Sequence, residues 1–414
     1  MLSNEPISVA LIMRHFHPVL AGAAERFRRY APGLTQRGVR LSVFASHEPS
    51  SVPVREEIDG LIPIWRLKTR SSGAHEDRTL FNLAEEHLLT CPDFKAQIVQ
   101  TTLARRAITS SLWRLRRKGF FMIHAGTMVD EPFTPPPFIK RLRMRLSHQW
   151  NYLPFHRCIA STKTMADWHQ RMGIPVGKIR VIPSGVNTQR FRPTETFAEK
   201  SALRQSLGIP AERLVVLFVG NILPRKGLHL LLQAWKHLHH HPLRPLLIII
   251  GAWDRQTVIS SSAQNDLRLY QEKLRGILRR FPEDSFRLVA ENQQIEDWYR
   301  AADMFVLPSE REGMVNVVME AMSSGLPTLV TEHTGMPMDE LGVSDVTHLL
   351  IKRNEDEIAR HIRRLIENPS LLSSLALNAR QHCVARLSLD KTLDAYSKLY
   401  QEGSRFGVKD KDGP

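Results

Sequence analysis

Two carboxylates accompany the expected start of a helix in the segment that runs from Pro308 to Pro327. An apolar run, Met304 to Leu307, ends at the loop that opens this helix. Such a loop leaves backbone N–H groups free at the helix start, where the helix dipole favours phosphate and other anions. Glu312 lies in the loop, and Glu320 follows about two helical turns later. The segment therefore predicts a ligand site in which the two carboxylates hold separate ends of an extended molecule.

The free N–H groups belong to Gly313, Met314 and Val315. A ligand with a sugar at one end, a diphosphate in the middle and a ribose at the other end would suit these groups. The N–H groups would bind the diphosphate, and the carboxylates would accept hydrogen bonds from vicinal hydroxyl groups at the two ends. A simpler alternative is an acidic helix start that suits the dipole, followed by one solvated glutamate. These residues alone leave both interpretations open.

A second loop, Gly220 to Gly227, also follows an apolar run and precedes an expected helix. It places Arg225 and Lys226 at a helix start, where the dipole disfavours cations. An anion held between these cations and the N-terminal amides would explain their position. The loop has neither Walker A spacing nor the G-x-G-x-x-G pattern, which argues against a nicotinamide dehydrogenase. The alternative is a turn with two exposed cations.

Apolar runs alternate with helical patterns along the chain in two similar cycles. The first cycle has strands at Ile7 to Met13, Leu41 to Ala45, Gln97 to Gln100, Phe120 to His124 and Arg157 to Ala160. The second has them at Leu214 to Gly220, Leu246 to Ile250, Phe286 to Ala290, Met304 to Leu307 and Thr328 to Thr331. Continuous apolar strands are typical of parallel sheets covered on both faces. We therefore expect an α/β protein with ligands at the carboxyl ends of its strands.

The chain has 414 residues, which favours two domains. We expect a first domain at 1–190, a second at 191–390, and a C-terminal helix and tail at 391–414 that crosses back to the first. Three cysteines without a C-x-x-C pair suit a reducing compartment and no structural zinc. The N-terminal residues lack a signal-peptide pattern, and no apolar run is long enough to span a bilayer. The sequence predicts a cytoplasmic protein.

The net charge of +15 is concentrated in one part of the chain. Thirteen Lys and Arg lie between Phe94 and Ala166, against Asp130 and Glu131 alone. Aromatic residues are mixed with the cations in the basic segment 105–157, which suits an anionic membrane surface. A nucleic-acid groove would need similar charge, but no nucleic-acid-binding signature accompanies it, and no nucleic-acid partner is expected. A solvated basic face remains the alternative.

The ordered motifs resemble the family-4 glycosyltransferases, whose fold is GT-B, with two Rossmann-like parallel-sheet domains that face a cleft. The resemblance rests on Gly220 to Gly227, on the Glu-x(7)-Glu spacing of Glu312 and Glu320, and on two further segments. Those segments are the sequence from Ile179 to Pro193 and the sequence from Asp297 to Leu307. The resemblance covers almost the whole chain.

The resemblance implies roles for individual residues. Lys226 and Arg225 would bind the donor diphosphate, with the amides of Gly313, Met314 and Val315. Glu320 would hold the ribose, and Glu312 would contact the transferred sugar near the reacting centre.

Two further positions of the resemblance lie in the expected first domain. His124 matches a histidine near the sugar donor, although a lone histidine at a strand end is more often structural. Gly22 keeps the first of two glycines that approach the donor phosphates in the family, and Ala23 and Ala24 follow it. Asn221 and Val315 also depart from the common pattern, which puts the identity of the donor in doubt.

The resemblance implies a glycosyltransferase of the kind used in polysaccharide biosynthesis. It would move a sugar from a nucleotide-diphosphate donor to a glycan, lipid-linked or small-molecule acceptor, with retention of configuration. Neither a cofactor nor a metal is expected, since the nucleotide sugar is a co-substrate. We expect the protein to lie in the cytoplasm, in part at the inner face of the membrane. Two alternatives stay open: a nucleic-acid-binding protein on an α/β scaffold, and a non-catalytic nucleotide-sugar sensor.

Overall fold

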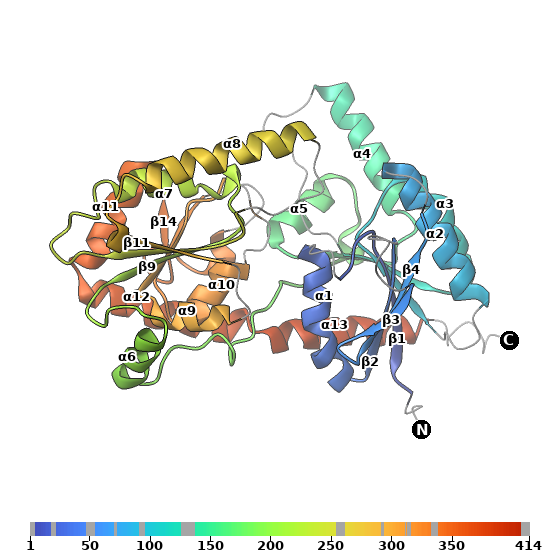
Figure 1. Ribbon diagram of the computed structural model, residues 1–414. Coiled ribbons are helices and arrows are strands. Elements are labelled where there is room, and N and C mark those ends of the chain that lie inside the picture. Colours follow the sequence, from blue (N-terminus) through green and yellow to red (C-terminus); the bar gives the residue numbers. More distant parts are fainter. Residues whose placement is uncertain are drawn as a thin grey trace. The chain divides into compact units, whose positions relative to one another are not determined.

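The structure is a computed structural model that describes residues 5–17, 22–46, 54–69, 73–90, 96–125, 137–253, 261–290, 294–310, 312, 316–332 and 338–406. The chain divides into two compact units. Unit 1 comprises residues 1–184 and 390–414, and unit 2 comprises residues 185–389. Each unit is built around one sheet with helices on its faces (Figure 1).

The sheet of unit 1 has the strand order β3-β4-β2-β1-β5-β6-β7-β8. Its strands are β1 (Ile7–Ile12), β2 (Val39–Ser46), β3 (Arg55–Ile58), β4 (Ile62–Leu67), β5 (Ile98–Thr101), β6 (Phe121–Ala125), β7 (Arg157–Ala160) and β8 (Ile179–Val181). All neighbours pair in parallel except β3, which runs antiparallel to β4 at the sheet edge. The expected parallel sheet therefore carries a hairpin that the sequence analysis missed.

The helices of unit 1 cover both faces of this sheet. They are α1 (Gly22–Gln36), α2 (Gly73–Thr90), η1 (Arg106–Ile108), α3 (Thr109–Arg117), α4 (Phe138–Tyr152), α5 (Lys163–Arg171), η2 (Val176–Lys178) and α13 (Leu389–Ser404). Side chains from α2, α3 and α5 share one core cluster with alternate residues of the central strands. On the other face, Tyr396 of α13 packs edge-on against Phe27 of α1.

The final helix, α13, is tied to unit 1 by polar contacts as well as by packing. The Tyr400 hydroxyl donates a hydrogen bond to Gln100 Oε1 in β5 at 2.9 Å. Arg37 donates to Asp394 at 2.7 Å, and Arg157 of β7 forms an ion pair with Glu402. The end of the chain thus completes the layer of helices on the first sheet.

The sheet of unit 2 is parallel, with the order β11-β10-β9-β12-β13-β14. Its strands are β9 (Val215–Val219), β10 (Leu246–Ile250), β11 (Phe286–Val289), β12 (Met304–Leu307), β13 (Thr328–Thr331) and β14 (Leu349–Ile351). Residues of β9, β10 and β12 are buried along their whole length, which agrees with a sheet covered on both faces.

The helices of unit 2 lie on both sides of this sheet, with α7 and α8 on one side and α9 and α12 on the other (Figure 1). They are α6 (Phe197–Ser206), η3 (Pro224–Lys226), α7 (Leu228–Trp235), α8 (Ser261–Leu278), η4 (Glu283–Ser285), α9 (Ile295–Ala301), α10 (Asn316–Ser323), η5 (Met338–Leu341), α11 (Glu355–Ile366) and α12 (Pro369–Arg386). Among the described residues, no helix is both long and apolar enough to cross a membrane.

Side-chain caps fix where several helices of unit 2 begin. The side chains of Thr196, Asn354 and Asn368 each accept a hydrogen bond from a backbone N–H group in the first turn of α6, α11 and α12. The first turn of α11 is acidic and its last turn is basic, which complements the helix dipole.

Candidate active site

The two loops singled out in the sequence meet at one edge of the unit 2 sheet. One follows β9 and the other follows β12, and these strands are parallel neighbours, with Met304 opposite Val216. Because parallel strands end at the same edge, the loops after them are brought together. The backbone N–H of Glu310 donates to the carbonyl of Arg225 at 2.8 Å, which joins the loops directly.

Glycine makes the close approach of the two loops possible. A Cβ atom on Gly227 would lie 2.0 Å from the carbonyl oxygen of Pro308, and Gly227 has a φ of +73°. Both facts exclude a larger residue at the position between η3 and α7. The glycine therefore sets the spacing of the loops that carry the charged side chains.

Arg225, Lys226 and Glu312 form one ionic cluster. Lys226 Nζ lies 2.5 Å from Glu312 Oε1, and Arg225 Nη1 lies 3.3 Å from the same oxygen. The Ser309 hydroxyl donates a third contact to this oxygen at 2.8 Å. The side chains of Lys226 and Glu312 are 11% and 10% exposed, whereas that of Arg225 is 46% exposed. The cluster thus has a buried ion pair with a cation open to solvent beside it.

Burial and charge oppose each other in this ion pair. Burial raises the pKa of Glu312, but the charge and hydrogen bond of Lys226, together with Arg225 and Ser309, outweigh it and leave the pKa below its usual value. Burial lowers the pKa of Lys226, and the attraction of Glu312 offsets only part of that effect. The carboxylate therefore stays ionised, and together with Arg225 the cluster has two cations for one carboxylate at the sheet edge.

Glu320 has a separate partner. It lies in α10, and its Oε2 accepts a hydrogen bond at 3.1 Å from the hydroxyl of Tyr299 in α9. Tyr299 is buried, and burial and the neighbouring carboxylate raise its pKa well above the usual value. The phenol therefore stays protonated and orients the carboxylate.

The remaining expected site residues lie outside this cluster. Gly313, Met314 and Val315 fall outside the described residues. Gly22 is the first residue of α1 in unit 1. Among the described residues, no three His, Cys, Asp or Glu side chains gather as a possible metal site.

His124 is buried at the end of β6 in unit 1 within a group of aromatic rings. Its Nε2 lies 3.4 Å from the Tyr152 hydroxyl, and its ring packs edge-on against Phe155 and His169. Burial and the nearby His169 lower the pKa of His124 to about 3. The imidazole is therefore neutral at physiological pH.

Two family models match the chain in succession. "Glycosyltransferase Family 4" matches residues 20–190, and "Glycosyl transferases group 1" matches residues 199–382. The chain belongs to the family-4 glycosyltransferases. A D-inositol 3-phosphate glycosyltransferase from Streptomyces bingchenggensis is 32% identical over 60% of this chain and 53% of its own length. A second, from Thermobispora bispora, is 30% identical over 59% of this chain and 56% of its own.

This family-4 chain spans about half the length of the curated relatives that it matches. Solved structures resemble it over nearly the whole chain. Sucrose-phosphate synthase from Thermosynechococcus elongatus has a TM-score of 0.76 at 19% identity and covers 96% of this chain and 98% of its own. Anabaena HepE, solved with UDP, has a TM-score of 0.73 at 16% identity and covers 96% and 100%. These similarities confirm the predicted GT-B class, with its two Rossmann-like domains.

Sequence reasoning missed two residues that orient the two carboxylates of the site. Ser309 lies two residues after the end of β12, and its hydroxyl donates to Glu312, while Thr331 donates to the Ser309 carbonyl at 2.5 Å. Tyr299 stands in a segment used for the resemblance, but nothing in its spacing relates it to Glu320. One sequence signal was available, a polar residue shortly after a buried strand, and it could have identified Ser309 but not Tyr299.

Proposed function

We propose that the protein is a glycosyltransferase that takes a sugar from a nucleotide-diphosphate donor and transfers it with retention of configuration. The observation that carries the proposal is the cluster of Lys226, Arg225 and Glu312 at the carboxyl edge of β9 and β12. Two cations beside a half-buried loop suit a diphosphate, because charge-assisted hydrogen bonds to phosphate are strong there. No cofactor is proposed beyond the nucleotide sugar itself.

The cations would act on the leaving group. As the bond to the sugar breaks, negative charge grows on the diphosphate, and groups already held in place stabilise it without reorganisation. Lys226 is fixed by its ion pair, and Arg225 is exposed enough to move onto a ligand. We propose that both bind the diphosphate, with the amides of Gly313, Met314 and Val315 and the backbone near Gly22.

The two glutamates would act at the ends of the donor. Glu312 would contact the transferred sugar beside the diphosphate, and Glu320 would accept hydrogen bonds from the ribose hydroxyls. The hydrogen bond from Tyr299 supports this role for Glu320, because a protonated phenol that donates to the carboxylate holds it in one orientation. His124 would contact the sugar as a neutral imidazole, in line with its lowered pKa.

The acceptor is proposed to bind to unit 1 and to be a glycan or a lipid-linked molecule. The domain boundaries expected from the sequence, 1–190 and 191–390, assign the acceptor to the first domain and the donor to the second. We also propose that the basic segment 105–157 meets an anionic membrane surface, which would put the protein at the inner face of the membrane.

The exposed part of that segment supports a membrane contact. Several of its cations bind within the fold, because Arg114 pairs with Glu85 at 2.6 Å and Arg157 pairs with Glu402. Residues 137–143 of the chain, by contrast, are all exposed, and they include Phe138 and Ile139 at 69% and 72% exposure. Flotation with vesicles of phosphatidylglycerol at low salt tests the contact, and a protein that ignores them contradicts it.

A thermal-shift panel of nucleotides and nucleotide sugars tests the donor site. A ligand that binds only the folded protein raises its midpoint of unfolding. UDP is the first compound to include, since the similar Anabaena protein was solved with it. We expect at least one nucleoside diphosphate to stabilise the protein, and to lose that effect in Lys226→Ala. If no nucleoside diphosphate stabilises the wild type, the donor site is wrong.

Two further measurements, release of the nucleoside diphosphate and binding of nucleic acid, separate the alternative functions. A non-catalytic sensor would bind a nucleotide sugar without releasing the nucleoside diphosphate, so release of UDP or another diphosphate during incubation supports the enzyme. A nucleic-acid-binding protein would bind DNA or RNA tightly and in a salt-dependent manner, and Glu320→Ala would leave that binding unchanged.

A further inference from the structure

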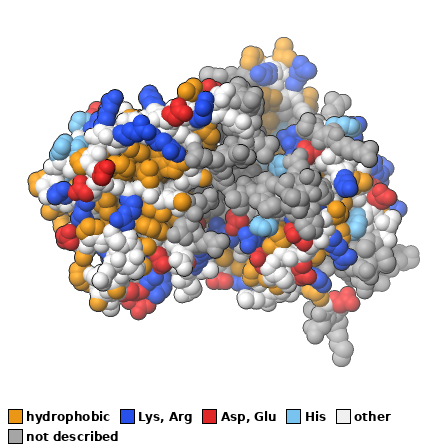
Figure 2. All heavy atoms as spheres, in the orientation of Figure 1, with side chains coloured by type: hydrophobic (Ala, Val, Ile, Leu, Met, Phe, Trp, Pro, Cys, Tyr) orange, Lys and Arg blue, Asp and Glu red, His pale blue; other side chains and the backbone are white. Residues whose placement is uncertain are grey.

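Helix α4 presents an apolar row to solvent in unit 1. Its members recur every three or four positions, which places them on one side of the helix. They are Ile139, Leu142, Leu146, Trp150 and Leu153 just after the helix, and their exposure runs from 46% to 72%. Figure 2 shows hydrophobic and basic side chains together over this helix, at the top of the view. An exposed row of this size marks a contact surface.

Basic residues flank the apolar row on both sides. At 3.6 residues per turn, Lys140 and Arg143 fall on one side of the row, and Arg141 and Arg145 fall on the other. No acidic residue occurs in α4. None of the four cations forms an ion pair with another described residue. The helix therefore has the apolar and basic faces of a helix that lies in a membrane interface.

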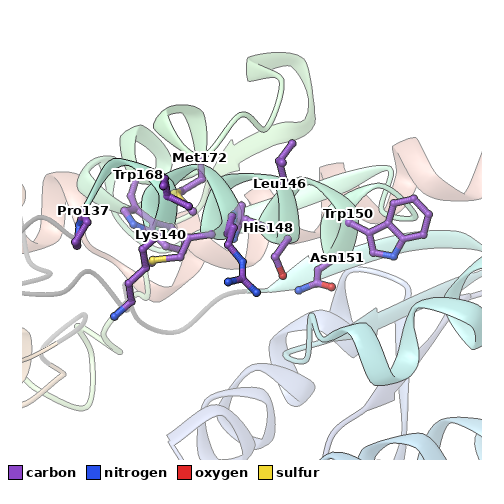
Figure 3. Close-up of a pocket in the computed structure, with 12 residues that line it drawn as sticks. Pro137, Lys140, Leu146, His148, Trp150, Asn151, Trp168 and Met172 are labelled. Carbon is purple, nitrogen blue, oxygen red and sulfur yellow. The ribbon is translucent and has the colours of Figure 1, made fainter.

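A groove of about 1220 Å³ runs beside the row, where α4 lies along α5 (Figure 3). Lys140, Arg143, Ser147 and Asn151 line it at spacings that place them on one face of α4. Trp168 of α5 and Met172, which follows that helix, line it as well. In Figure 3, Lys140 and Asn151 extend to the same side of α4, and Leu146 extends to the other. The lining of the groove thus combines cations and hydrogen-bonding groups with apolar side chains.

One polar side chain of the groove suits a ligand with hydroxyl groups. Ser147 lines the groove and is exposed one helical turn after Arg143. Its hydroxyl can donate a hydrogen bond to a ligand hydroxyl or accept one from it.

We propose that this groove binds the headgroup of an anionic phospholipid. The phosphate lies between Lys140 and Arg143, a headgroup hydroxyl reaches Ser147 one helical turn after Arg143, and the acyl chain leaves along the apolar row and past Trp168. The inference rests on the proposed membrane contact, but it does not depend on sugar transfer. The groove goes further than that contact because it is a specific phosphate-binding site and not only a charged surface.

The chain offers a matched pair of variants to test the site. Lys140→Gln with Arg143→Gln removes two charges from the groove. Arg141→Gln with Arg145→Gln removes two charges from the same helix outside the groove. All four side chains are exposed, so neither double variant is expected to alter the fold, and circular dichroism checks this.

The probe is dihexanoyl phosphatidylglycerol below its micelle concentration, measured by titration calorimetry on the full chain. Dihexanoyl phosphatidylcholine is the control lipid, and farnesyl phosphate represents a lipid-linked acceptor. We expect the groove variant to weaken binding of the phosphatidylglycerol by at least about tenfold, because charge-assisted hydrogen bonds are lost. The control variant should stay within about twofold of the wild type, since its charges act only at a distance.

The outcomes separate the groove from the membrane contact. If both double variants weaken the soluble lipid equally, the helix is a charged surface and the groove site is wrong. If the wild type floats with anionic vesicles but ignores the soluble phosphates, the membrane contact stands and the groove site is again overturned. Tighter binding of phosphatidylglycerol than of farnesyl phosphate supports the site, and the reverse order overturns it as a phospholipid site.

Discussion

Lys226 Nζ lies 2.5 Å from Glu312 Oε1, although the two residues come from loops after different strands. The pair is almost fully buried, so each charge depends on the other. Removal of one partner leaves an uncompensated buried charge, which is more costly than the loss of the pair itself.

This dependence predicts that Lys226→Ala has two separable effects. The variant should lose about 3 kcal/mol of unfolding free energy, because the Glu312 carboxylate remains buried without its partner. It should also lose nucleoside diphosphate binding. The double variant with Glu312→Ala should recover most of the stability and none of the binding, as measured by urea unfolding and calorimetry with UDP. Lys236→Ala, at an exposed lysine of the same unit, is the control and should change neither quantity.

If Lys226→Ala binds UDP as tightly as the wild type does, the lysine does not hold the diphosphate. If the double variant is no more stable than Lys226→Ala, the loss comes from packing of the lysine stem and not from the unpaired carboxylate.

Substitution to alanine should change the unfolding free energy in opposite directions at two glycines of unit 2. Gly227→Ala places a Cβ atom 2.0 Å from the Pro308 carbonyl oxygen at a φ of +73°, so we expect a loss of about 3 kcal/mol. Gly276 lies inside α8 with no atom within 4 Å of the same Cβ position. Gly276→Ala should add about 1 kcal/mol, the usual helix preference for alanine. Thermal and urea unfolding measure both, and a stabilising Gly227→Ala would contradict the close approach of the loops.

Two histidines in contact, one in α4 and one in α5, predict that the stability of unit 1 is sensitive to acid. Burial, with His169 nearby, lowers the pKa of His148 to about 3, and burial lowers that of His169 to about 4. The unfolded chain takes up protons near the ordinary histidine pKa of about 6.5, while the folded chain does not. The stability that these groups contribute is therefore complete above pH of about 6.5 and is lost as pH falls toward their folded pKa values.

His148→Phe should flatten this dependence. The ring stacks on Tyr152 with a centroid distance of 4.3 Å, and phenylalanine keeps that contact while it removes the titrating group. Urea unfolding between pH 4.5 and pH 7.5 should show a slope reduced by up to about 1.4 kcal/mol per pH unit. An unchanged slope would mean that His148 is already protonated in the folded protein.

The sequence singled out the two loops of unit 2 because the relevant signals are local. A buried strand, a polar loop and a helix follow one another around Lys226 and again around Glu312, and each pattern spans a few residues. That β9 and β12 are neighbours depends on the order of strands in the sheet, which local patterns do not encode. The resemblance to a family indicated that the two loops act together, and the structure shows contacts between them.

Other features lacked a readable signal. The β3 strand reads Arg-Glu-Glu-Ile, with no apolar run, and its hairpin with β4 was missed. The alternating cations and apolar residues of α4 have a period of two in the sequence, whereas their arrangement in rows appears only when a helix winds them. The hydrogen bond from Tyr299 to Glu320 joins two helices and required coordinates.

The position of α13 has a consequence for synthesis. The first unit is interrupted by the whole of the second, so its helical layer stays unfinished until residues 390–404 have left the ribosome. The second unit is continuous in sequence and can complete its sheet first, although synthesis of the first unit begins earlier. In a nascent chain halted after residue 389, Phe27, Tyr30 and Gln100 would lack the tyrosines that contact them. We expect chaperones to bind this exposed surface.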